Sequence, residues 1–372
     1  MSNNNGRMAR SNNSAKNNMS NKNNGKRKNP KSKKRKVLKV ILIILVVLIV
    51  IIAAVFAAGY TYIYSMLGEM QQEEIDLNAV SIDEAVADEL SDYRNIALFG
   101  IDSREDDYGR GNRSDCIIIA SINKKTNEVK LVSVYRDTYL LLTGRNLDKV
   151  THAYSYGGPE LAVSTLNANL DLNIKEYVTV NFAAVVDAVD ALGGIKMTIT
   201  KDEVEYINRY IDGNNKITGH NSSHISTAGT YNLDGVQALA YSRIRYTAGG
   251  DYKRTERMRD VLEAMLNKAK TLSISELINF VNIMLPKIST NISSGDIIGL
   301  APALININIS ESNGWPEKTQ GDTIGGVYYG VPVNLAENVS QLHEELFGQT
   351  DYTCSKTVQG ISNQIITKTG IQ

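Results

Sequence analysis

"DCIIIASINKKTNEVKLVSVYRD" (Asp115–Asp137) predicts a β-hairpin. Two apolar runs rich in β-branched residues flank the polar segment "NKKTN", whose length suits a hairpin turn. If the turn is centred between Lys125 and Thr126, the numbers of paired residues add up to 251. That register places Asp115 opposite Arg136, although a slip of one or two residues would move the pairing.

A third apolar run, "NIALFGID", precedes the hairpin and predicts another buried strand. We expect it to run antiparallel to the first hairpin strand, so that its last residues reach the same edge of the sheet. Polar groups at the mouth of a buried sheet are typical of ligand sites in α/β proteins, while a solvated rim of loop charges is the alternative interpretation. The side chains that converge there belong to Asp102, Arg104, Arg113, Asp115, Arg136 and Asp137.

Helical and strand patterns alternate after the hairpin. Residues 157–172 and 182–192 predict helices, and "EYVTVNF" and "GGIKMTI" predict strands. This alternation favours a layered α-β-α domain with a central mixed β-sheet.

The stretch "YSRIRYTAGGDYKRTERMR" (Tyr241–Arg259) holds five arginines and a lysine against one Asp and one Glu. Its second half predicts a helix over 255–268, with Arg254 pointing inward at the helix N-terminus, where free N–H groups favour an anion. The alternative makes Arg254 a structural partner of Asp251 or Glu256. The same helical periodicity predicts that Arg259 is solvated.

The N-terminal residues predict a membrane anchor. Residues 1–36 form a basic tail of disordered composition, and an apolar run within residues 37–64 has the length of a transmembrane helix. A cleaved signal peptide is the alternative. Since cytoplasmic flanks carry the excess of Lys and Arg, we expect the tail inside the cell and the rest outside.

The exported part divides into an acidic spacer at 65–92, a catalytic domain at 93–348 and a polar tail at 349–372. Removing the thirteen basic residues that precede the apolar run leaves 27 basic against 40 acidic residues, a net charge of about −13. This charge argues against a nucleic-acid partner. Two cysteines, Cys116 and Cys354, make no disulfide framework, and a small buried side chain is favoured over a bridge for Cys116.

Seven blocks, in order, resemble the LytR-CpsA-Psr family of cell-wall ligases. They are "NIALFGIDSR", "RSD", "SVYRDTYL", "KVTHAYSYGGPELA", "VTVNFAAVVDAVDALGGIKM", "LDGVQALAYSRIRY" and "DYKRTERMR". The resemblance covers residues 95–269 and continues more weakly to 348. It implies a phosphotransferase that moves a glycopolymer, of teichoic acid or capsular polysaccharide type, from an undecaprenyl pyrophosphate carrier onto peptidoglycan as a phosphodiester.

The resemblance also implies roles for particular residues. Asp102 and Asp115 resemble the aspartates that hold Mg²⁺ or Mn²⁺, and a metal-adjacent carboxylate of this pair is the expected base for the acceptor hydroxyl. Arg136 is expected to act in catalysis beside them. The expected pyrophosphate-binding residues are Arg113, Arg136, Arg243 and Arg254, with Arg104, Lys149 and Arg257 as further candidates.

The chain departs from the family pattern at Ile101, Tyr135, Thr151 and Met258, but retains the residue types of the clamp and the metal site. Three other functions stay open: a membrane-anchored transcriptional regulator or attenuator, a lipid pyrophosphate phosphatase and a silent glycopolymer-binding module.

Overall fold

The computed structural model describes residues 71–72, 74–103, 107–293, 296 and 308–372. The basic tail expected at 1–36, the membrane helix expected at 37–64 and the first residues of the expected spacer lie outside these ranges. Within them, no helix has both the length and the apolar character that crossing a membrane requires.

The predicted hairpin and the strand before it form the middle of the central sheet. Strand β2 (Tyr93–Ile101) pairs antiparallel with β3 (Ser114–Asn123), which pairs antiparallel with β4 (Glu128–Val134). The β3–β4 register joins Ile118 to Ser133 and Ile119 to Val132, so paired numbers add up to 251, as predicted.

In the described part of the chain, seven strands form this sheet, in the order β1-β10-β7-β2-β3-β4-β11. Strand β7 runs parallel to β2 and β11 runs parallel to β4, which confirms the predicted mixed α/β class. The four outer strands are β1 (Gln71–Gln72), β10 (Ile288–Thr290), β7 (Glu176–Asn181) and β11 (Asn308–Trp315).

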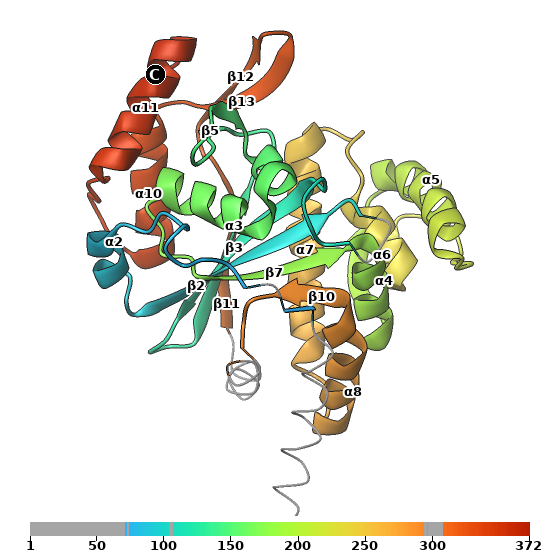
Figure 1. The fold of residues 1–372 in the computed structure, drawn as a ribbon. Coiled ribbons are helices and arrows are strands. Elements are labelled where there is room, and N and C mark those ends of the chain that lie inside the picture. The colour runs from blue at the N-terminus through green and yellow to red at the C-terminus, as the bar shows by residue number, and fades with distance from the viewer. Residues whose placement is uncertain (1–70, 73, 104–106, 294–295, 297–307) are drawn as a thin grey trace, which may run out of the picture. The chain divides into compact units, whose positions relative to one another are not determined.

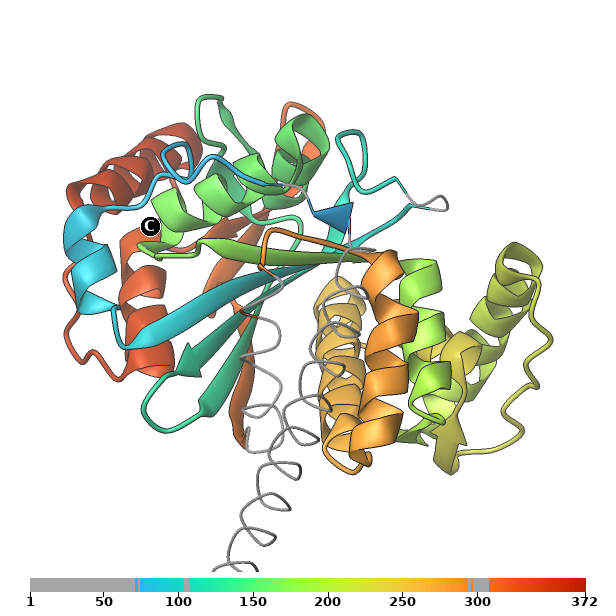
Figure 2. The ribbon, with the colours of Figure 1, turned by 60° about the horizontal axis from the view of Figure 1, so that its bottom comes forward.

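Both faces of the sheet are covered by helices (Figures 1 and 2). Because side chains alternate along a strand, Ile117 and Ile119 pack into the core that includes α3 (Val150–Leu170). Ile118 and Ala120 face the opposite side, where they pack with side chains of α7 (Gly250–Ala269). Helix α7 begins five residues before the predicted start at Thr255.

A second core lies among the helices beside the sheet. Strand β8 (Ile195–Ile199) forms as predicted, but it pairs with β9 (Gly229–Leu233) in a separate two-stranded sheet. The helical elements of this region are α4 (Phe182–Ala191), α5 (Lys201–Thr218), α6 (Gly235–Ser242), α8 (Ile274–Met284) and the short 3₁₀ helix η1 (Leu285–Lys287).

The remaining elements surround α3 and the end of β4. Two short hairpins are β5 (Tyr139–Leu141) with β6 (Leu147–Lys149), and β12 (Thr319–Ile324) with β13 (Val327–Pro332). The helices are α2 (Glu84–Glu89), α10 (Leu335–Phe347) and α11 (Lys356–Thr369).

The segments that flank the expected catalytic domain pack into its main core. Val80, Val86 and Leu90 of the expected spacer are buried there. Residues 349–372, expected as a polar tail, contain α11, whose Val358 and Ile365 are fully buried. The polar residues of α11 are spaced so that one apolar face remains, and that face reaches the core.

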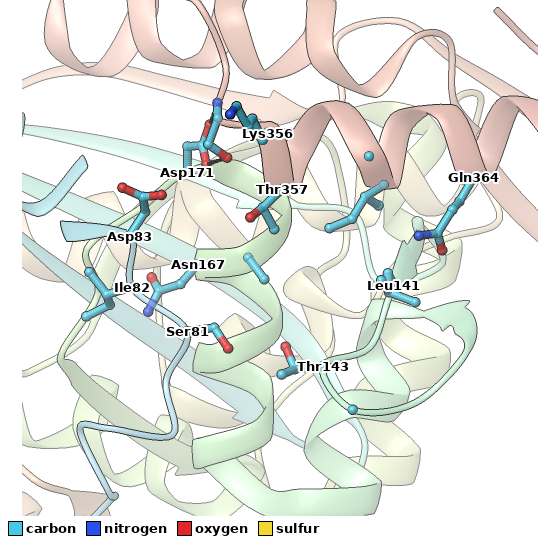
Figure 3. Close-up of a pocket in the computed structure, with 15 residues that line it drawn as sticks. Ser81, Ile82, Asp83, Leu141, Thr143, Asn167, Asp171, Lys356, Thr357 and Gln364 are labelled. Atoms are coloured by element: carbon cyan, nitrogen blue, oxygen red, sulfur yellow. Dashed lines mark hydrogen bonds between the residues drawn. The ribbon is translucent and has the colours of Figure 1, made fainter. Parts of the chain in front are cut away.

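A pocket of about 650 Å³ lies between α11 and the C-terminal end of α3. Figure 3 shows Asn167 of α3 on one side of the pocket and Thr357 of α11 on the other, with Asp171, the residue after α3, next to Lys356. Asp171 accepts hydrogen bonds from the Ser355 backbone N–H (2.7 Å) and hydroxyl (2.6 Å), so this carboxylate anchors the start of α11.

Ile365 of α11 is fully buried in the main core. Replacing it with Ala should lower the free energy of unfolding by about 2–5 kcal/mol, the cost of truncating a large buried side chain. The measurement is urea unfolding of the exported domain. Asn363→Ala, at an exposed position of the same helix, is the control and should change stability by about 0.5 kcal/mol or less. Equal stabilities of the two variants would show that α11 is not part of the cooperative fold.

Candidate active site at the sheet edge

The edge where β2 ends and β3 begins carries the two predicted metal ligands. Asp102 follows the last residue of β2, and its backbone N–H donates to the Arg113 carbonyl (3.3 Å). Gly100 pairs with Cys116 whereas Ile101 pairs with Ser114, so Asp115 is the extra residue of a β-bulge. Bulges redirect side chains and are common next to active sites.

Gly100 permits this close pairing, because a Cβ there would lie 2.9 Å from the Cys116 Cβ.

Asp115 lies across from Arg136, as the register predicts. The Arg136 Nη1 donates to Asp115 Oδ1 at 2.6 Å. Burial disfavours the charged guanidinium, but Asp115, Asp137 and Asp251 outweigh burial and raise the pKa of Arg136. The first predicted contact of the site is thus confirmed, and it is an ion pair.

A chain of ion pairs extends from Arg136 to both flanking helices. Asp137 lies 2.8 Å from Lys149 Nζ at the start of α3. Asp251, in the first turn of α7, lies 3.9 Å from Arg136 Nε and 2.7 Å from Arg254 Nη2. Three carboxylates and three cations therefore alternate along this edge.

The positive and negative charges at the edge are equal in number, but some of the arginine N–H groups have no hydrogen-bond acceptor in the described part of the chain. Arg136 Nε, Arg254 Nε and Arg254 Nη2 are buried without a hydrogen-bond partner among the described residues. The Arg254–Asp251 contact is an ion pair by distance, and its angle falls outside hydrogen-bond geometry. Since buried donors are nearly always satisfied in folded proteins, by protein groups, ordered water or a ligand, these three N–H groups require an acceptor from outside the described residues.

Arg254 is only 5% exposed, and the structure gives it both of the roles considered from sequence. It is the partner of Asp251, and it retains donors for an anion. Because α7 begins at Gly250, Arg254 lies in the second turn of the helix, and its guanidinium reaches back to Asp251 in the first turn.

Arg243 and Asp102 line one pocket of about 370 Å³, whose wall also includes Phe182, Val186 and Leu239. Arg243 Nη1 donates to the Asn214 side chain (2.8 Å), and its guanidinium lies 4.8 Å from the centre of the Phe182 ring. The pocket thus combines a cation and a carboxylate with an apolar wall.

Arg257 does not take part in the site, contrary to its candidacy in the clamp. It is 1% exposed, and its Nε, Nη1 and Nη2 donate to Glu203, the Ile244 carbonyl and Thr247 at 2.8–2.9 Å. All three nitrogens are therefore engaged in joining α7 to α5 and to the segment after α6.

Arg259 was expected in solvent, and this prediction is wrong. It is 7% exposed, and its Nε donates to Ser312 of β11 (3.1 Å). The helical periodicity failed because α7 is covered on two sides: Leu262 packs against the sheet, and Val261 packs against the second core.

The other predicted residues lie at the rim or outside the described residues. Arg113 is exposed, and its positive charge acts on the nearby Tyr156. Arg104 lies outside the described residues. The sequence interpretation left out Arg245, although "SRIRY" places it two residues after Arg243. Arg245 is exposed and lies near enough to Arg136 for the two charges to interact.

A histidine–carboxylate pair at this edge was also missed. His152 Nδ1 lies 2.9 Å from Asp148 Oδ2. The four-residue spacing of the two side chains was the signal available in the sequence.

Both cysteines are free, as favoured from sequence. Burial raises the pKa of the Cys116 thiol to about 12, and neighbouring Arg254 only partly opposes that effect. The Cys116 thiol is thus protonated at neutral pH.

The fold and this edge define a class of protein: a mixed α/β domain with arginine donors arranged for an anion at one end of its sheet. The particular family follows from comparison with known proteins. The model of the LytR_cpsA_psr family matches residues 58–345, and the chain belongs to that family.

Named enzymes are among the relatives. Over 222 residues the chain is 36% identical to the polyisoprenyl-teichoic acid–peptidoglycan teichoic acid transferase TagT of Bacillus subtilis (strain 168), covering 59% of this chain and 66% of that relative, just under two thirds of its length. It is 31% identical over 266 residues to a transferase of the same description, TagU, of Oceanobacillus iheyensis, covering 68% of this chain and 75% of TagU. The solved structure of TagT bound to LIIa-WTA aligns with a TM-score of 0.53 at 28% identity, covering 75% of this chain and 92% of that one.

Replacing Arg257 with Ala should lower the free energy of unfolding by about 3–5 kcal/mol, because Glu203 would stay buried without its cation. Burial raises the pKa of Glu203, but hydrogen bonds from Thr200 and Arg257 outweigh burial and hold it below its usual range. The stabilisation is therefore present at neutral pH and is lost as the pH falls through that lowered pKa.

The measurement is denaturant unfolding at several pH values. The difference between wild type and variant should be largest near pH 7 and shrink below about pH 4. A difference that stays constant with pH would contradict the assigned ion pair.

Proposed function

We propose that the protein transfers a glycopolymer of the teichoic acid type from a polyprenyl pyrophosphate carrier onto peptidoglycan. The observation that carries this proposal is the set of three buried, unpartnered N–H groups on Arg136 and Arg254. They need an anionic acceptor, and a pyrophosphate supplies several oxygens. The printed names of the relatives give the polyisoprenyl carrier, the teichoic acid and the peptidoglycan acceptor.

Arg136, Arg243 and Arg254 would hold the pyrophosphate. A guanidinium presents two parallel donors that match phosphate oxygens, and donors fixed before the reaction stabilise the charge that develops on the transferring phosphoryl group. Asp115 and Asp251 keep Arg136 and Arg254 oriented. The apolar wall formed by Phe182, Val186 and Leu239 beside Arg243 suits the first units of a polyprenyl chain.

Asp102 and Asp115 would hold a Mg²⁺ or Mn²⁺ ion. Their chemistry fits, because such hard cations take one or two carboxylates and complete their shell with water and substrate phosphate oxygens. Among the described residues no group of three or more His, Cys, Asp or Glu is arranged for a metal, so the remaining ligands would come from substrate and water. When bound, the ion would neutralise part of the pyrophosphate charge.

The proposal includes the location of the enzyme. The basic tail and the apolar run of the N-terminal residues support a single-pass anchor with a cytoplasmic N-terminus and the catalytic domain outside the cell. There the domain meets its lipid-linked donor and peptidoglycan.

Replacing Arg254 or Arg243 with Ala should lower turnover about 10- to 100-fold, since a hydrogen bond to a charged group contributes about 1.5–3 kcal/mol and a tenfold rate change corresponds to about 1.4 kcal/mol. Arg254→Lys should rescue little, because an ammonium cannot bind two oxygens in parallel. The assay follows transfer from a synthetic polyprenyl pyrophosphate donor onto peptidoglycan by the full-length protein in detergent.

Arg209→Ala is the matched control: this exposed arginine of α5 contacts Glu205 and Tyr206 of its own helix and should keep wild-type turnover. Thermal unfolding separates loss of fold from loss of chemistry. Full transfer by a folded Arg254→Ala variant would overturn the proposed clamp, and a wild-type protein without transfer would overturn the function.

Asp102→Ala and Asp115→Asn should each weaken Mn²⁺ binding and remove the stimulation of transfer by divalent cations. Asn at position 115 keeps a partner for Arg136 while removing the charge that a metal needs. Binding is measured by electron paramagnetic resonance of Mn²⁺ in the presence of donor, with the exposed Asp88→Ala as control. Unchanged Mn²⁺ affinity in both variants would disprove the metal site.

A further inference from the structure

The Asp148–His152 pair lies on the side of the sheet edge opposite α7. Thr151, the residue before His152, donates its backbone N–H to the Arg136 carbonyl (3.2 Å) and its hydroxyl to the Ser114 carbonyl (2.9 Å). Thr151 therefore ties the first turn of α3, which also carries His152, to the strand ends that carry Asp115 and Arg136.

Asp148 is fixed by several donors. Its Oδ1 accepts from the Lys149 backbone N–H (2.8 Å) and the Tyr329 hydroxyl (3.4 Å), and its Oδ2 accepts from the Tyr156 hydroxyl (3.3 Å) as well as facing His152. Burial raises the pKa of Asp148, but hydrogen bonds from His152, Lys149 and Tyr156 outweigh it and hold the pKa below its usual range. The carboxylate is thus ionised at neutral pH and is held by several donors.

A fixed carboxylate sets the orientation and the tautomer of the imidazole. With Nδ1–H facing Asp148, the lone pair of the neutral ring is on Nε2. Nε2 has no hydrogen-bond partner among the residues that the structure describes, and the His152 side chain is 21% exposed, so a ligand can reach it. This is the arrangement of a base held by a third group, as in nucleophile–histidine–carboxylate sites.

The alternative bases are less free. Asp115 Oδ1 is engaged by Arg136, and both Asp115 and Asp102 are the residues assigned to the metal. His152 Nε2 has neither commitment.

We infer that His152 is the general base for the acceptor hydroxyl and that Asp148 is its positioning residue; this inference rests on the proposed transferase function. The acceptor oxygen bonds to the phosphorus that carries the glycopolymer, and the bond from that phosphorus to the oxygen bridging the two phosphates breaks. The bridging oxygen leaves with the polyprenyl phosphate. The hydroxyl proton moves to His152 Nε2, and Asp148 stabilises the imidazolium that results.

The charged and titratable groups that face the pair come from four parts of the chain. The ring of Tyr156 in α3 is tilted to the imidazole, with 5.7 Å between ring centres, and the Arg145 guanidinium lies 4.9 Å from the centre of the Tyr156 ring. Lys149 Nζ lies 5.7 Å from the centre of the Tyr329 ring on β13. Arg113, before β3, acts on Tyr156. The positive charges of Arg145, Lys149 and Arg113 would also favour an anionic donor close to the place where the acceptor binds.

The test compares His152→Gln with wild type in the full-length transfer assay, together with donor binding. General base catalysis contributes about 10²- to 10⁴-fold, so the turnover number should fall by that range while the Kd for the lipid-linked donor stays unchanged. The transfer rate should also respond to pH differently in the wild type and in the variant, because the variant has no imidazole at this position.

His224→Gln is the matched control, because His224 also pairs with an aspartate, Asp212 (2.8 Å), but on the exposed surface of α5. It should keep both the rate and the pH profile. Should His152→Gln fail to fold, Asp148→Asn provides the same comparison: it should lower the turnover number without changing donor affinity.

Wild-type turnover and an unchanged pH profile in a folded His152→Gln variant would overturn the inference while leaving the transferase function intact. A fall in donor affinity equal to the fall in rate would also overturn it, since His152 would then bind the donor. Absence of transfer by the wild type would instead count against the proposed function.

Discussion

The fixed register between β3 and β4 is the constraint on which the rest of the structure depends. Side chains alternate along a strand, so a slip of one residue would turn Ile117 and Ile119 toward α7 and would turn Ile118 and Ala120 toward α3. Both faces are covered by helices, and each would have to repack. The same slip would separate Asp115 from Arg136, so the packing of the core and the geometry of the site are specified together.

Ion pairing and hydrogen bonding serve different purposes at the sheet edge. Asp115, Asp137 and Asp251 neutralise the buried or half-buried cations Arg136, Lys149 and Arg254, which lowers the cost of holding these cations away from water. The N–H groups on Arg136 and Arg254 that have no partner among the described residues still need a hydrogen-bond acceptor in a particular direction. An anion that enters would therefore gain hydrogen bonds without first displacing a carboxylate.

One helix distributes its arginines among three environments. On α7, Arg254 faces the sheet edge, Arg257 joins the helix to Glu203 of α5, and Arg259 reaches Ser312 of β11. Arg257 and Arg259 fasten α7 to both neighbouring layers, so that Arg254 is held in place by its own helix. The start of α3 approaches the edge from the other side through Thr151. The site therefore lies between the beginnings of α3 and α7.

Local sequence determined the strands at the centre of the sheet, the hairpin register and hence the Asp115–Arg136 pair, because a hairpin joins neighbours in sequence and its period of two fixes which residues face each other. Seven short blocks of sequence were also enough to indicate the LytR-CpsA-Psr family. Tertiary structure alone decided that Arg259 is buried, that Arg257 is engaged by Glu203, that α11 belongs to the core and that Thr151 joins the start of α3 to the strand ends. Periodicity shows which residues share a face of a helix, but only long-range packing decides how many of its faces are covered and which distant groups meet them.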